Sequence, residues 1–471
     1  MNSQAPLKWF NKFGGAGLDI GYGVKETFKR QYIICGSTTS FGYGSTDAYL
    51  ILIDSMGQKV WEKSFGGALT DVAKKIVVNP IDSGYIFVGY TNSLGSGGYD
   101  LYIVRTDKNG SLIWQKSFGG LDWDFGNDLA IGPDGNVYVC GSTYSMGYGN
   151  KDAYLLKINS TNGIPIWQKT FGGNLDDEFK SLKITNTNSL IIAGQTKSYN
   201  DNFGDILFFK LSLNGDSIFS KTYGLKNKED YANSIIENFA STGYVLSGGT
   251  ESYSTFGKDA FIFGIDALGD STWLVNYGNA NLDQESIKVL PASNNTGTYV
   301  ISYSDVENSF FKRNPKNLIL NSVGVYYTGH DFGDTEDEEF YDLENTSDNG
   351  FIGVGYTYSF GSNISDVFVV KYDSLVIEGS NLIGVRENEK ILNRNVEVYP
   401  THLSNGINSI YIASEKPINV KVIDLFGRTV NFTIEKLSSS YVVNLNQSNN
   451  GVYFLILAID NEIYRYKILK E

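Results

Sequence analysis

Short apolar runs of four to eight residues, separated by polar turns, follow one another along most of the chain. The runs are rich in Val, Ile, Tyr and Phe, and turn sequences such as Lys108-Asn109-Gly110 and Pro133-Asp134-Gly135 bound them. No apolar segment is long and periodic enough to form a substantial helix. Run length, residue types and boundaries are those of β-strands, so the pattern predicts an all-β protein.

The strand pattern repeats about every 53 residues, and one aromatic residue marks each copy: Trp9, Trp61, Trp114, Trp167, Phe219, Trp273 and Tyr326. The best preserved copies continue with Phe-Gly-Gly, an aspartate, an apolar run ending in Gly-x-Thr, a loop rich in Ser, Gly and Tyr, and an Asp-x-Tyr-Leu strand. About four strands in about fifty residues is the size of one β-propeller blade.

Counting the repeats predicts seven blades. The Asp-x-Tyr-Leu type of strand begins at Asp47, Asp100, Asp152, Asp205, Asp259 and Asp366, with a degenerate copy near residues 317–320. The Trp9 strand precedes every other strand of its class, and the Asp366 strand has no Trp strand after it. We therefore expect residues 1–377 to form a seven-bladed β-propeller of four-stranded blades, its ring closed by the N-terminal strand.

The remaining residues follow a different pattern. The aromatic and Phe-Gly-Gly punctuation stops near Gly384, and short alternating strands occur at 396–399, 410–412, 420–423, 441–443 and 452–456. This spacing predicts a small β-sandwich over residues 384–471. The polar segment 378–383 is expected to be the linker between the two domains.

Three ordered blocks in this tail resemble the type A C-terminal sorting domain of the bacterial type IX secretion system. The matching positions are Tyr399, Pro400, Asp424, Gly427, Arg428, Gly451, Tyr453 and Lys467. The family usually continues Tyr-Pro with Asn-Pro, whereas this chain has Thr401-His402. The resemblance implies export across the outer membrane after recognition by the translocon and its barrel-shaped shuttle protein, and then removal of the tail within residues 374–395. The propeller repeats also resemble those of secreted bacterial propeller proteins.

Export of this kind requires an N-terminal signal peptide, and the sequence starts Met-Asn-Ser-Gln-Ala-Pro with no apolar segment behind it. We therefore expect the sequence to represent a mature or recombinant form. No apolar run is long enough for a transmembrane helix.

The charge of the chain is unevenly distributed. The formal net charge is −14, and residues from Gly384 onward carry ten Lys or Arg and nine Asp or Glu, so the propeller carries about −15. Such a surface repels phosphate backbones, and nucleic acid is not an expected partner. The acidic run from Asp334 to Glu339 is expected to be a solvated loop, with a calcium site as the alternative.

Residues suited to catalysis or cofactor binding are scarce. His330 and His402 lie in different predicted domains, so neither a catalytic triad nor a histidine metal site is expected. The recurrent Asp71, Asp124 and Asp177 are expected to fix turns through hydrogen bonds to the backbone. No cofactor is expected.

Two cysteines occupy equivalent positions in different repeats. Cys35 lies in the first repeat and Cys140 in the third, with an intervening blade between them. That separation exceeds the reach of a disulfide, so both are expected to be buried and unpaired.

Phe41, Tyr43 and Tyr148 lie in the Ser/Gly/Tyr-rich loops, which should gather on one side of the propeller. They are candidate ligand-facing residues for an unknown protein or glycan. The sequence thus predicts a non-enzymatic, secreted or cell-surface binding protein. One alternative is a structural accessory that keeps its tail on the translocon, the shuttle or a surface-motility apparatus. Another is a carbohydrate-active enzyme that uses carboxylates in the propeller channel.

Overall fold

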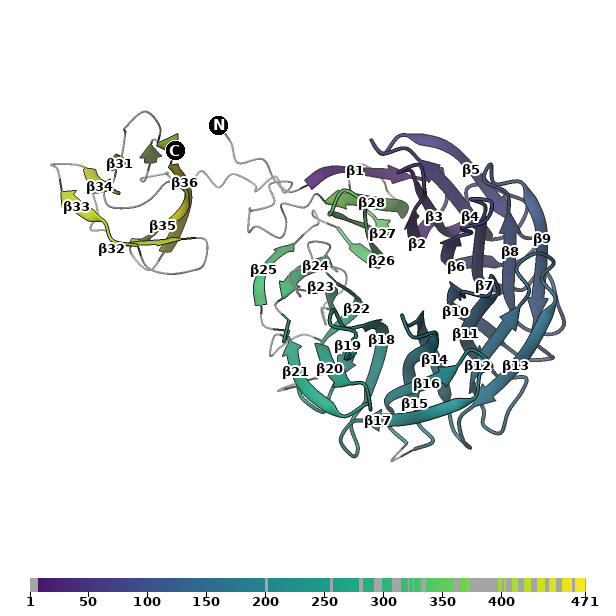
Figure 1. Cartoon of the computed structure of the whole chain (residues 1–471). Coiled ribbons are helices and arrows are strands. Elements are labelled where there is room, and N and C mark those ends of the chain that lie inside the picture. The colour runs from purple at the N-terminus through teal and green to yellow at the C-terminus, as the bar shows by residue number, and fades with distance from the viewer. Residues whose placement is uncertain are drawn as a thin grey trace. The chain divides into compact units, whose positions relative to one another are not determined.

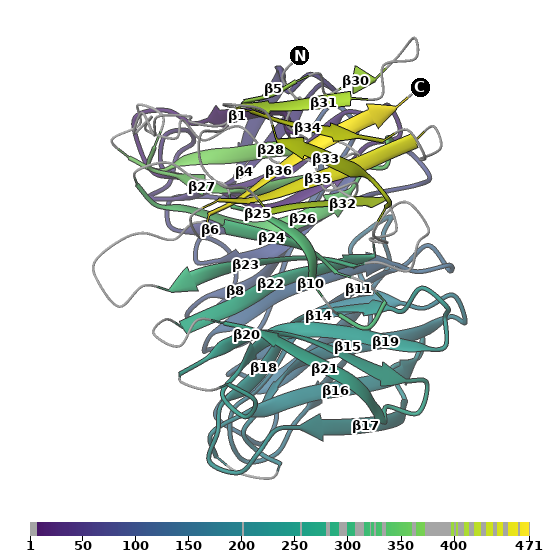
Figure 2. The same cartoon turned by 90° about the vertical axis from the view of Figure 1, so that its left-hand side faces the viewer.

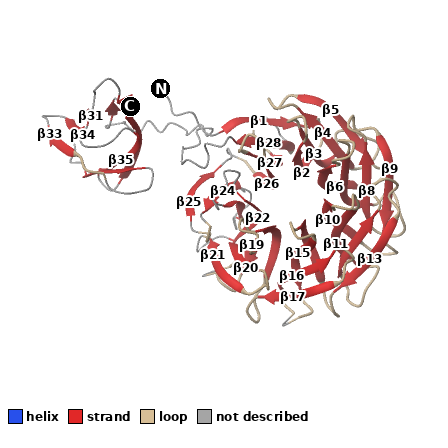
Figure 3. Ribbon diagram, in the orientation of Figure 1, coloured by secondary structure: helices blue, strands red, loops and turns tan. Residues whose placement is uncertain are grey.

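A computed structural model describes two compact units, Met1–Val385 and Arg386–Glu471. In the first unit the described residues are 7–199, 202–254, 257–278, 283–291, 299–306, 315–320, 322–324, 326–331, 336–359 and 364–372. In the second they are 397–399, 402–403, 409–413, 419–424, 430–436, 440–445, 451–459 and 462–470. Within these residues all regular structure is β-strand (Figure 3). The predicted linker, 378–383, and the expected cleavage zone, 374–395, lie outside them.

The described part of the first unit contains seven four-stranded antiparallel sheets, of which six use consecutive strands. These six sheets are β2 (Asp19–Glu26), β3 (Tyr32–Thr38), β4 (Asp47–Ile53) and β5 (Lys59–Phe65); β6 (Asp71–Val78), β7 (Tyr85–Thr91), β8 (Asp100–Thr106) and β9 (Leu112–Phe118); β10 (Asp124–Ile131), β11 (Val137–Thr143), β12 (Asp152–Ile158) and β13 (Pro165–Phe171); β14 (Asp177–Ile184), β15 (Ser189–Thr196), β16 (Asp205–Ser212) and β17 (Ser217–Tyr223); β18 (Asp230–Glu237), β19 (Gly243–Thr250), β20 (Asp259–Asp266) and β21 (Ser271–Tyr277); and β22 (Asp283–Pro291), β23 (Tyr299–Val306), β24 (Pro315–Leu320) and β25 (Tyr326–Asp331).

The seventh sheet combines strands from opposite ends of the unit. It consists of β26 (Glu338–Asn345), β27 (Phe351–Thr357), β28 (Asp366–Tyr372) and β1 (Leu7–Phe13). β1 runs antiparallel to β28, with Phe13 opposite Val367 and Leu7 opposite Tyr372. The first strand of the chain therefore covers an edge of β28 that would otherwise be open to other chains.

Six of the seven sheets described in this unit are joined to the one before them by a backbone hydrogen bond near the start of their first strand. The backbone N–H of Asp71 donates to Thr46 O over 2.8 Å, and that of Asp124 donates to Tyr99 O over 2.6 Å. Asp19 N donates to Ser365 O over 2.8 Å, which links the first sheet to the last in the same way. The sheets follow one another around a common centre, with the first strand of each nearest to it (Figure 1, and from the side in Figure 2).

The cores of the first unit lie between sheets. Each hydrophobic cluster among its described residues draws side chains from two neighbouring sheets, as where Ile33 and Leu50 meet Phe87 and Tyr102. One cluster joins the first sheet to the last, because Val24 packs with Val354 and Val367, and Trp9 packs against its edge. Burying such side chains contributes roughly 1.5 to 3 kcal/mol each. Sheet-to-sheet packing is therefore the main source of this unit's stability.

The cysteine prediction is confirmed. Cys35 and Cys140 are both free and buried. Cys35 packs in the cluster between the first two sheets, and Cys140 in the cluster between the third and fourth. Burial raises the pKa of both thiols, so each behaves as a small apolar side chain.

The repeated tryptophans pack over turns in the next sheet. Trp61, on β5, lies against the β8–β9 turn, where Gly110 has a φ of 74°. A Cβ at Gly110 would lie 2.8 Å from Trp61 Cη2. Trp9 meets Gly57 in the same manner, with a Cβ-to-Cε3 distance of 2.9 Å. Glycine is needed at these turns both for its backbone conformation and for the space that the indole occupies.

This arrangement gives a matched pair of stability measurements. Gly135 has nearly the same φ as Gly110, 73°, but a Cβ there would meet only Ile81 Cδ1, at 3.9 Å. Gly135→Ala therefore adds backbone strain alone, whereas Gly110→Ala also crowds Trp61. We expect Gly110→Ala to lower the free energy of unfolding by about 1 to 3 kcal/mol more than Gly135→Ala does. Chemical denaturation measures the difference. If both variants lose the same free energy of unfolding, the Trp61 side chain can move aside without cost, and the steric argument is wrong.

The second unit is a sandwich of two four-stranded sheets, ordered β29-β31-β34-β33 and β30-β36-β35-β32. The strands are β29 (Glu397–Tyr399), β30 (His402–Leu403), β31 (Ser409–Ala413), β32 (Asn419–Asp424), β33 (Thr433–Lys436), β34 (Ser440–Asn444), β35 (Gly451–Ile459) and β36 (Glu462–Lys470). Ile412 and Val443 from one sheet share a core with Val422 and Leu455 from the other. The inward-facing alternation read from the sequence therefore produces two packed sheets.

Candidate functional site

The recurrent aspartates fix turns, as predicted. Asp71 accepts hydrogen bonds from Gly67 N over 2.8 Å, from Ser93 Oγ over 2.6 Å and from Thr91 Oγ1. Asp124 and Asp177 accept the equivalent bonds from Gly120 N, over 3.0 Å, and Gly173 N, over 2.8 Å. In these three repeats the carboxylate oxygens already accept hydrogen bonds from the loop. They are therefore poorly placed to act as catalytic groups.

The acidic segment near Asp334 corrects one expectation. Asp334 and Thr335 lie outside the described residues, and Glu336 is exposed before the strand as expected, but Glu338 and Glu339 are buried rather than solvated. Glu338 begins β26 at the position that aspartate holds in five of the other six sheets and Gln284 holds in the sixth, and it accepts a hydrogen bond from Thr357 Oγ1 over 2.7 Å. A glutamate in place of the usual aspartate hides the start of this strand in the sequence, so the acidic run resembles a loop.

A β-bulge interrupts the first strand of each of the seven sheets described in the first unit. The register shifts between Ala73 and Lys75 in β6, for example, and between Phe340 and Asp342 in β26. A bulge leaves a backbone N–H after it without a ladder partner and re-aims the neighbouring side chains. Asp342 Oδ2 accepts such a bond from Val24 N over 3.2 Å, and Asp128 Oδ2 accepts one from Leu182 N over 3.0 Å.

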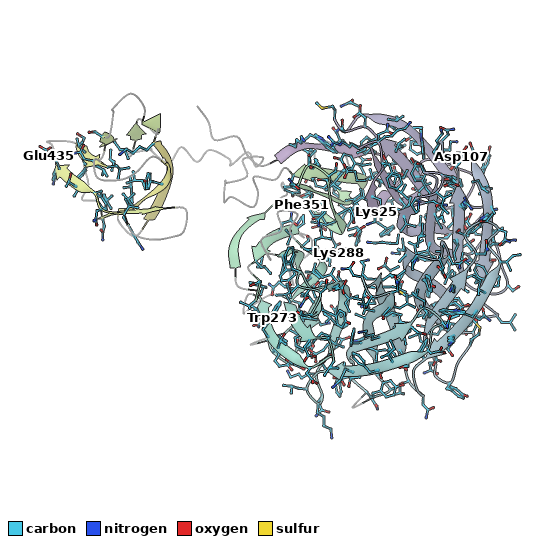
Figure 4. All side chains as sticks on the ribbon, in the orientation of Figure 1. Lys25, Asp107, Trp273, Lys288, Phe351 and Glu435 are labelled. Carbon is cyan, nitrogen blue, oxygen red and sulfur yellow. The ribbon has the colours of Figure 1, made fainter. Side chains whose placement is uncertain are left out.

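The bulges gather charged side chains into a central ion-pair cluster, defined here as Lys25, Lys75, Asp128, Lys183, Lys288, Asp342 and Glu344. Asp342 pairs with Lys75 and, over 3.2 Å, with Lys288. Asp128 pairs with Lys183 over 3.3 Å, and Glu344 pairs with Lys25. Figure 4 labels Lys25 and Lys288, which lie near the common centre of the unit.

The electrostatics of this cluster oppose acid catalysis. Burial alone would raise the pKa of Asp342, but the Lys288 and Lys75 ammonium groups overcome it and hold that pKa well below its ordinary range. The pKa of Asp128 is likewise lowered, against the effect of burial, by Lys183 and Lys75. A glycosidase general acid needs a raised pKa in order to stay protonated. These central carboxylates instead remain ionised and paired.

A cavity of about 520 Å³ borders the cluster. It is lined by the polar groups of Lys25, Lys183 and Glu344 and by apolar side chains that include Ile76, Leu129 and Leu290. Sequence reasoning placed acids near the channel but missed the lysines. The signal available was the Lys74-Lys75 pair inside an otherwise apolar strand.

The candidate ligand-facing aromatics differ in their surroundings. Tyr43 and Tyr148 are 97% and 88% exposed, in the loops after β3 and β11. Phe41 is only 36% exposed, and its ring stacks on Tyr49 with centroids 5.7 Å apart. Phe41 therefore packs on its own sheet, whereas the other two offer free rings on the same side of the unit.

A larger aromatic cluster lies on this side and escaped sequence reasoning. Trp123, just before β10, is half-exposed, and its ring centroid lies 6.1 Å from those of both Tyr99 and Tyr144. Phe125 and Tyr90 continue the cluster, with centroids 5.3 Å apart. The sequence held one clue, because Trp123 is a tryptophan outside the repeat spacing.

The sorting-motif residues fall mainly on strands of the second unit. Asp424 ends β32 opposite Tyr453 of β35, and Tyr453 is buried. Gly451 lies opposite Lys470, Lys467 opposite Phe454, and Tyr399 opposite Tyr411. Pro400, Gly427 and Arg428 lie outside the described residues.

The two histidines are not brought together by the structure. His330 lies on β25 and His402 on β30, in different units. Within the described ranges, no group of three or more His, Cys, Asp or Glu side chains is placed to hold a metal ion. The same ranges contain no apolar helix of membrane-spanning length.

Comparison with known proteins identifies the second unit. Residues 397–471 match the family of secretion system C-terminal sorting domains. The predicted resemblance is confirmed: the chain ends in a sorting domain of the type IX secretion system. Such a domain indicates export across the outer membrane, and it implies interaction with the type IX machinery.

Part of the chain is also similar to a curated bacterial protein at low identity. Regulatory protein FlaEY of Caulobacter vibrioides is 25% identical over 198 residues, which are 37% of this chain and 20% of that protein. The chain thus spans a fifth of the length of this curated relative.

Solved structures resemble the chain at low similarity. PorZ, an essential surface component of the type IX secretion system of Porphyromonas gingivalis, has a TM-score of 0.45 at 13% identity, covering 97% of this chain and 60% of PorZ. Sqt1 of Chaetomium thermophilum has a TM-score of 0.44 at 9% identity, covering 99% and 100%. The polysaccharide lyase Uly1 has a TM-score of 0.44 at 10% identity, covering 77% and 90%. These similarities are too low to transfer a function.

Proposed function

We propose that this chain is a non-enzymatic binding protein, exported by the type IX system and either released or held at the cell surface. The observation that carries the proposal is the sorting domain at residues 397–471. On the way out, the outer-membrane translocon and its barrel-shaped shuttle are the partners of this domain. The first unit then binds a protein or glycan.

The architecture we propose for the first unit is a closed seven-bladed β-propeller. Three observations support closure: β1 completes the sheet of β28, Asp19 N donates to Ser365 O, and Val24 packs with Val367. A closed ring gives a rigid support on which loops from successive blades form one continuous face.

The binding role is supported by aromatic side chains that are exposed to solvent and do not pack in the core. Tyr43 and Tyr148 are almost fully exposed, whereas the parts of each loop that recur between repeats are held by internal hydrogen bonds such as that from Gly149 N to Asp152 Oδ2, 2.9 Å. The central carboxylates, which a carbohydrate-active enzyme would need, are paired with lysines. Binding without turnover is the function that this chemistry favours.

A glycan array probed with the full chain tests the proposal. We expect the wild-type chain to bind, and the Tyr43→Ala/Tyr148→Ala variant to lose at least about tenfold in affinity, because aromatic anchors carry much of the energy of such contacts. Phe28→Ala, which removes an exposed ring from the turn at the opposite ends of the strands, is the control.

Two outcomes would count against the proposal. Release of new reducing ends from a polysaccharide panel would replace binding by catalysis. A mature surface form whose mass includes residues 397–471 would favour a structural accessory that stays with the secretion or motility apparatus.

A further inference from the structure

The aromatic cluster around Trp123 is not required by the blade fold. Tyr144 N donates to Trp123 O over 2.8 Å, and the same backbone bond joins Thr39 to Leu18, over 2.8 Å, and Lys197 to Asp176, over 2.8 Å. The backbone contact thus recurs in repeats whose side chains are small, aliphatic or charged. An indole and a phenol at these two positions serve something other than the turn.

The geometry leaves ring faces open to solvent. Trp123 is 50% exposed and Tyr144 is 37% exposed, and their planes meet at 72° with centroids 6.1 Å apart. Leu121, beside them, is 86% exposed. These two rings meet edge to face, and their exposed parts are called here the Trp123–Tyr144 notch. The C–H groups of a pyranose ring pack well on aromatic faces.

A cation that contacts aromatic rings lies at the inner end of the same cluster. The Lys74 ammonium group sits 3.8 Å from the centroid of the Tyr22 ring and 5.9 Å from that of Tyr90. Its neighbour Lys75 pairs with Asp342, but the described part of the chain gives Lys74 no carboxylate partner. Burial lowers the pKa of Lys74 to about 8, so a nearby anion would stabilise its charged form.

Contacts between rings connect the cation to the notch. Tyr90 lies against Phe125 with centroids 5.3 Å apart, and Phe125 lies 6.4 Å from Trp123. Tyr90 and Phe125 are both partly exposed, so aromatic surface continues from Trp123 toward Lys74. An extended ligand that packs on this surface can place an anionic group beside Lys74.

We propose that the Trp123–Tyr144 notch and Lys74 together bind an acidic polysaccharide whose sugars carry carboxylate groups. This rests on the proposed binding function and names its ligand class. Pyranose rings stack on Trp123 and Tyr144, and a uronate carboxylate supplies the missing partner of Lys74. The net charge of −14 repels polyanions at long range, so recognition depends on this local site.

Charge complementarity selects this occupant over a neutral glycan. A neutral sugar would fill the notch and leave Lys74 without a counter-charge, whereas a uronate satisfies both parts of the site. A protein partner is the competing occupant, and the experiment includes it as an outcome.

Calorimetric titration of the full chain tests the proposal. The probes are hexamers of galacturonate, mannuronate, guluronate and hyaluronan, each paired with its methyl ester, which keeps the rings and removes the charge. We expect at least one acid to bind about tenfold more tightly than its ester. Trp123→Ala should lose binding of both forms, whereas Lys74→Gln should weaken only the acid, to the level of the ester.

Controls separate binding from folding. Trp123→Phe keeps an aromatic face and should retain most of the affinity, and Phe28→Ala should bind like the wild-type chain. Thermal unfolding of every variant identifies any loss that comes from misfolding. If no acid binds, if acid and ester bind equally, or if Lys74→Gln leaves the preference unchanged, the proposal is overturned. Array binding to neutral glycans or to a protein would then leave the broader binding function standing.

Discussion

Removal of residues 1–13 should abolish cooperative folding of the first unit. β1 supplies ladder bonds along β28, from Phe13 opposite Val367 to Leu7 opposite Tyr372. It also brings Trp9 and Phe13 against the core shared by the first and last sheets. Losing these bonds and contacts should lower the free energy of unfolding by about 5 kcal/mol or more. Chemical denaturation followed by tryptophan fluorescence measures the loss.

A rearranged chain provides the control for this truncation. Because the Leu7 end of β1 lies beside Tyr372, a chain that carries residues 7–13 after Tyr372 through a short turn can form the same sheet as a hairpin. This variant should regain most of the stability. If the truncated chain unfolds at the wild-type denaturant concentration, β1 does not close the ring.

Asp342→Asn should produce the second large effect. The carboxylate is buried, faces both Lys75 and Lys288, and accepts a hydrogen bond from Val24 N. Its removal leaves two ammonium groups in a poorly solvated centre. Breaking a buried pair in this way costs about 3 to 5 kcal/mol. Asp216→Asn breaks an exposed pair with Lys169 and should cost about 1 kcal/mol at most.

The pH dependence of stability gives an independent check on Asp342. Its pKa is depressed in the folded chain, so its stabilisation is complete above the unfolded pKa, about 3.9, and is lost as the pH falls below about 4. The wild-type chain should therefore lose stability more steeply than Asp342→Asn between about pH 4 and pH 2. Parallel curves for the two chains would mean that this carboxylate is not paired as described.

The sequence predicted what depends on period and turn chemistry. Asp71 and Asp124 hold turns as expected, and the aromatic residues that recur about every 53 residues mark one strand of each four-stranded sheet. The three blocks of the tail identified the sorting domain. These features repeat, or match a known motif, and local residue patterns suffice to find them.

The sequence did not reveal what depends on departures from the repeat. A bulge after Ala73 cannot be read from residue types, so the different surroundings of Lys74 and Lys75 could not be foreseen. Glu338 replaces the repeated aspartate and was taken for part of a loop. Trp123 lies outside the tryptophan period and was therefore overlooked. The candidate binding site is built largely from such departures.

The shared seventh sheet also has a consequence for biosynthesis. Its last strand, β28, is translated long after β1, and the sorting domain is translated only after β28. A chain whose synthesis stops before β28 therefore lacks both the strand that pairs with β1 and the domain that indicates export. We expect such incomplete chains not to be exported.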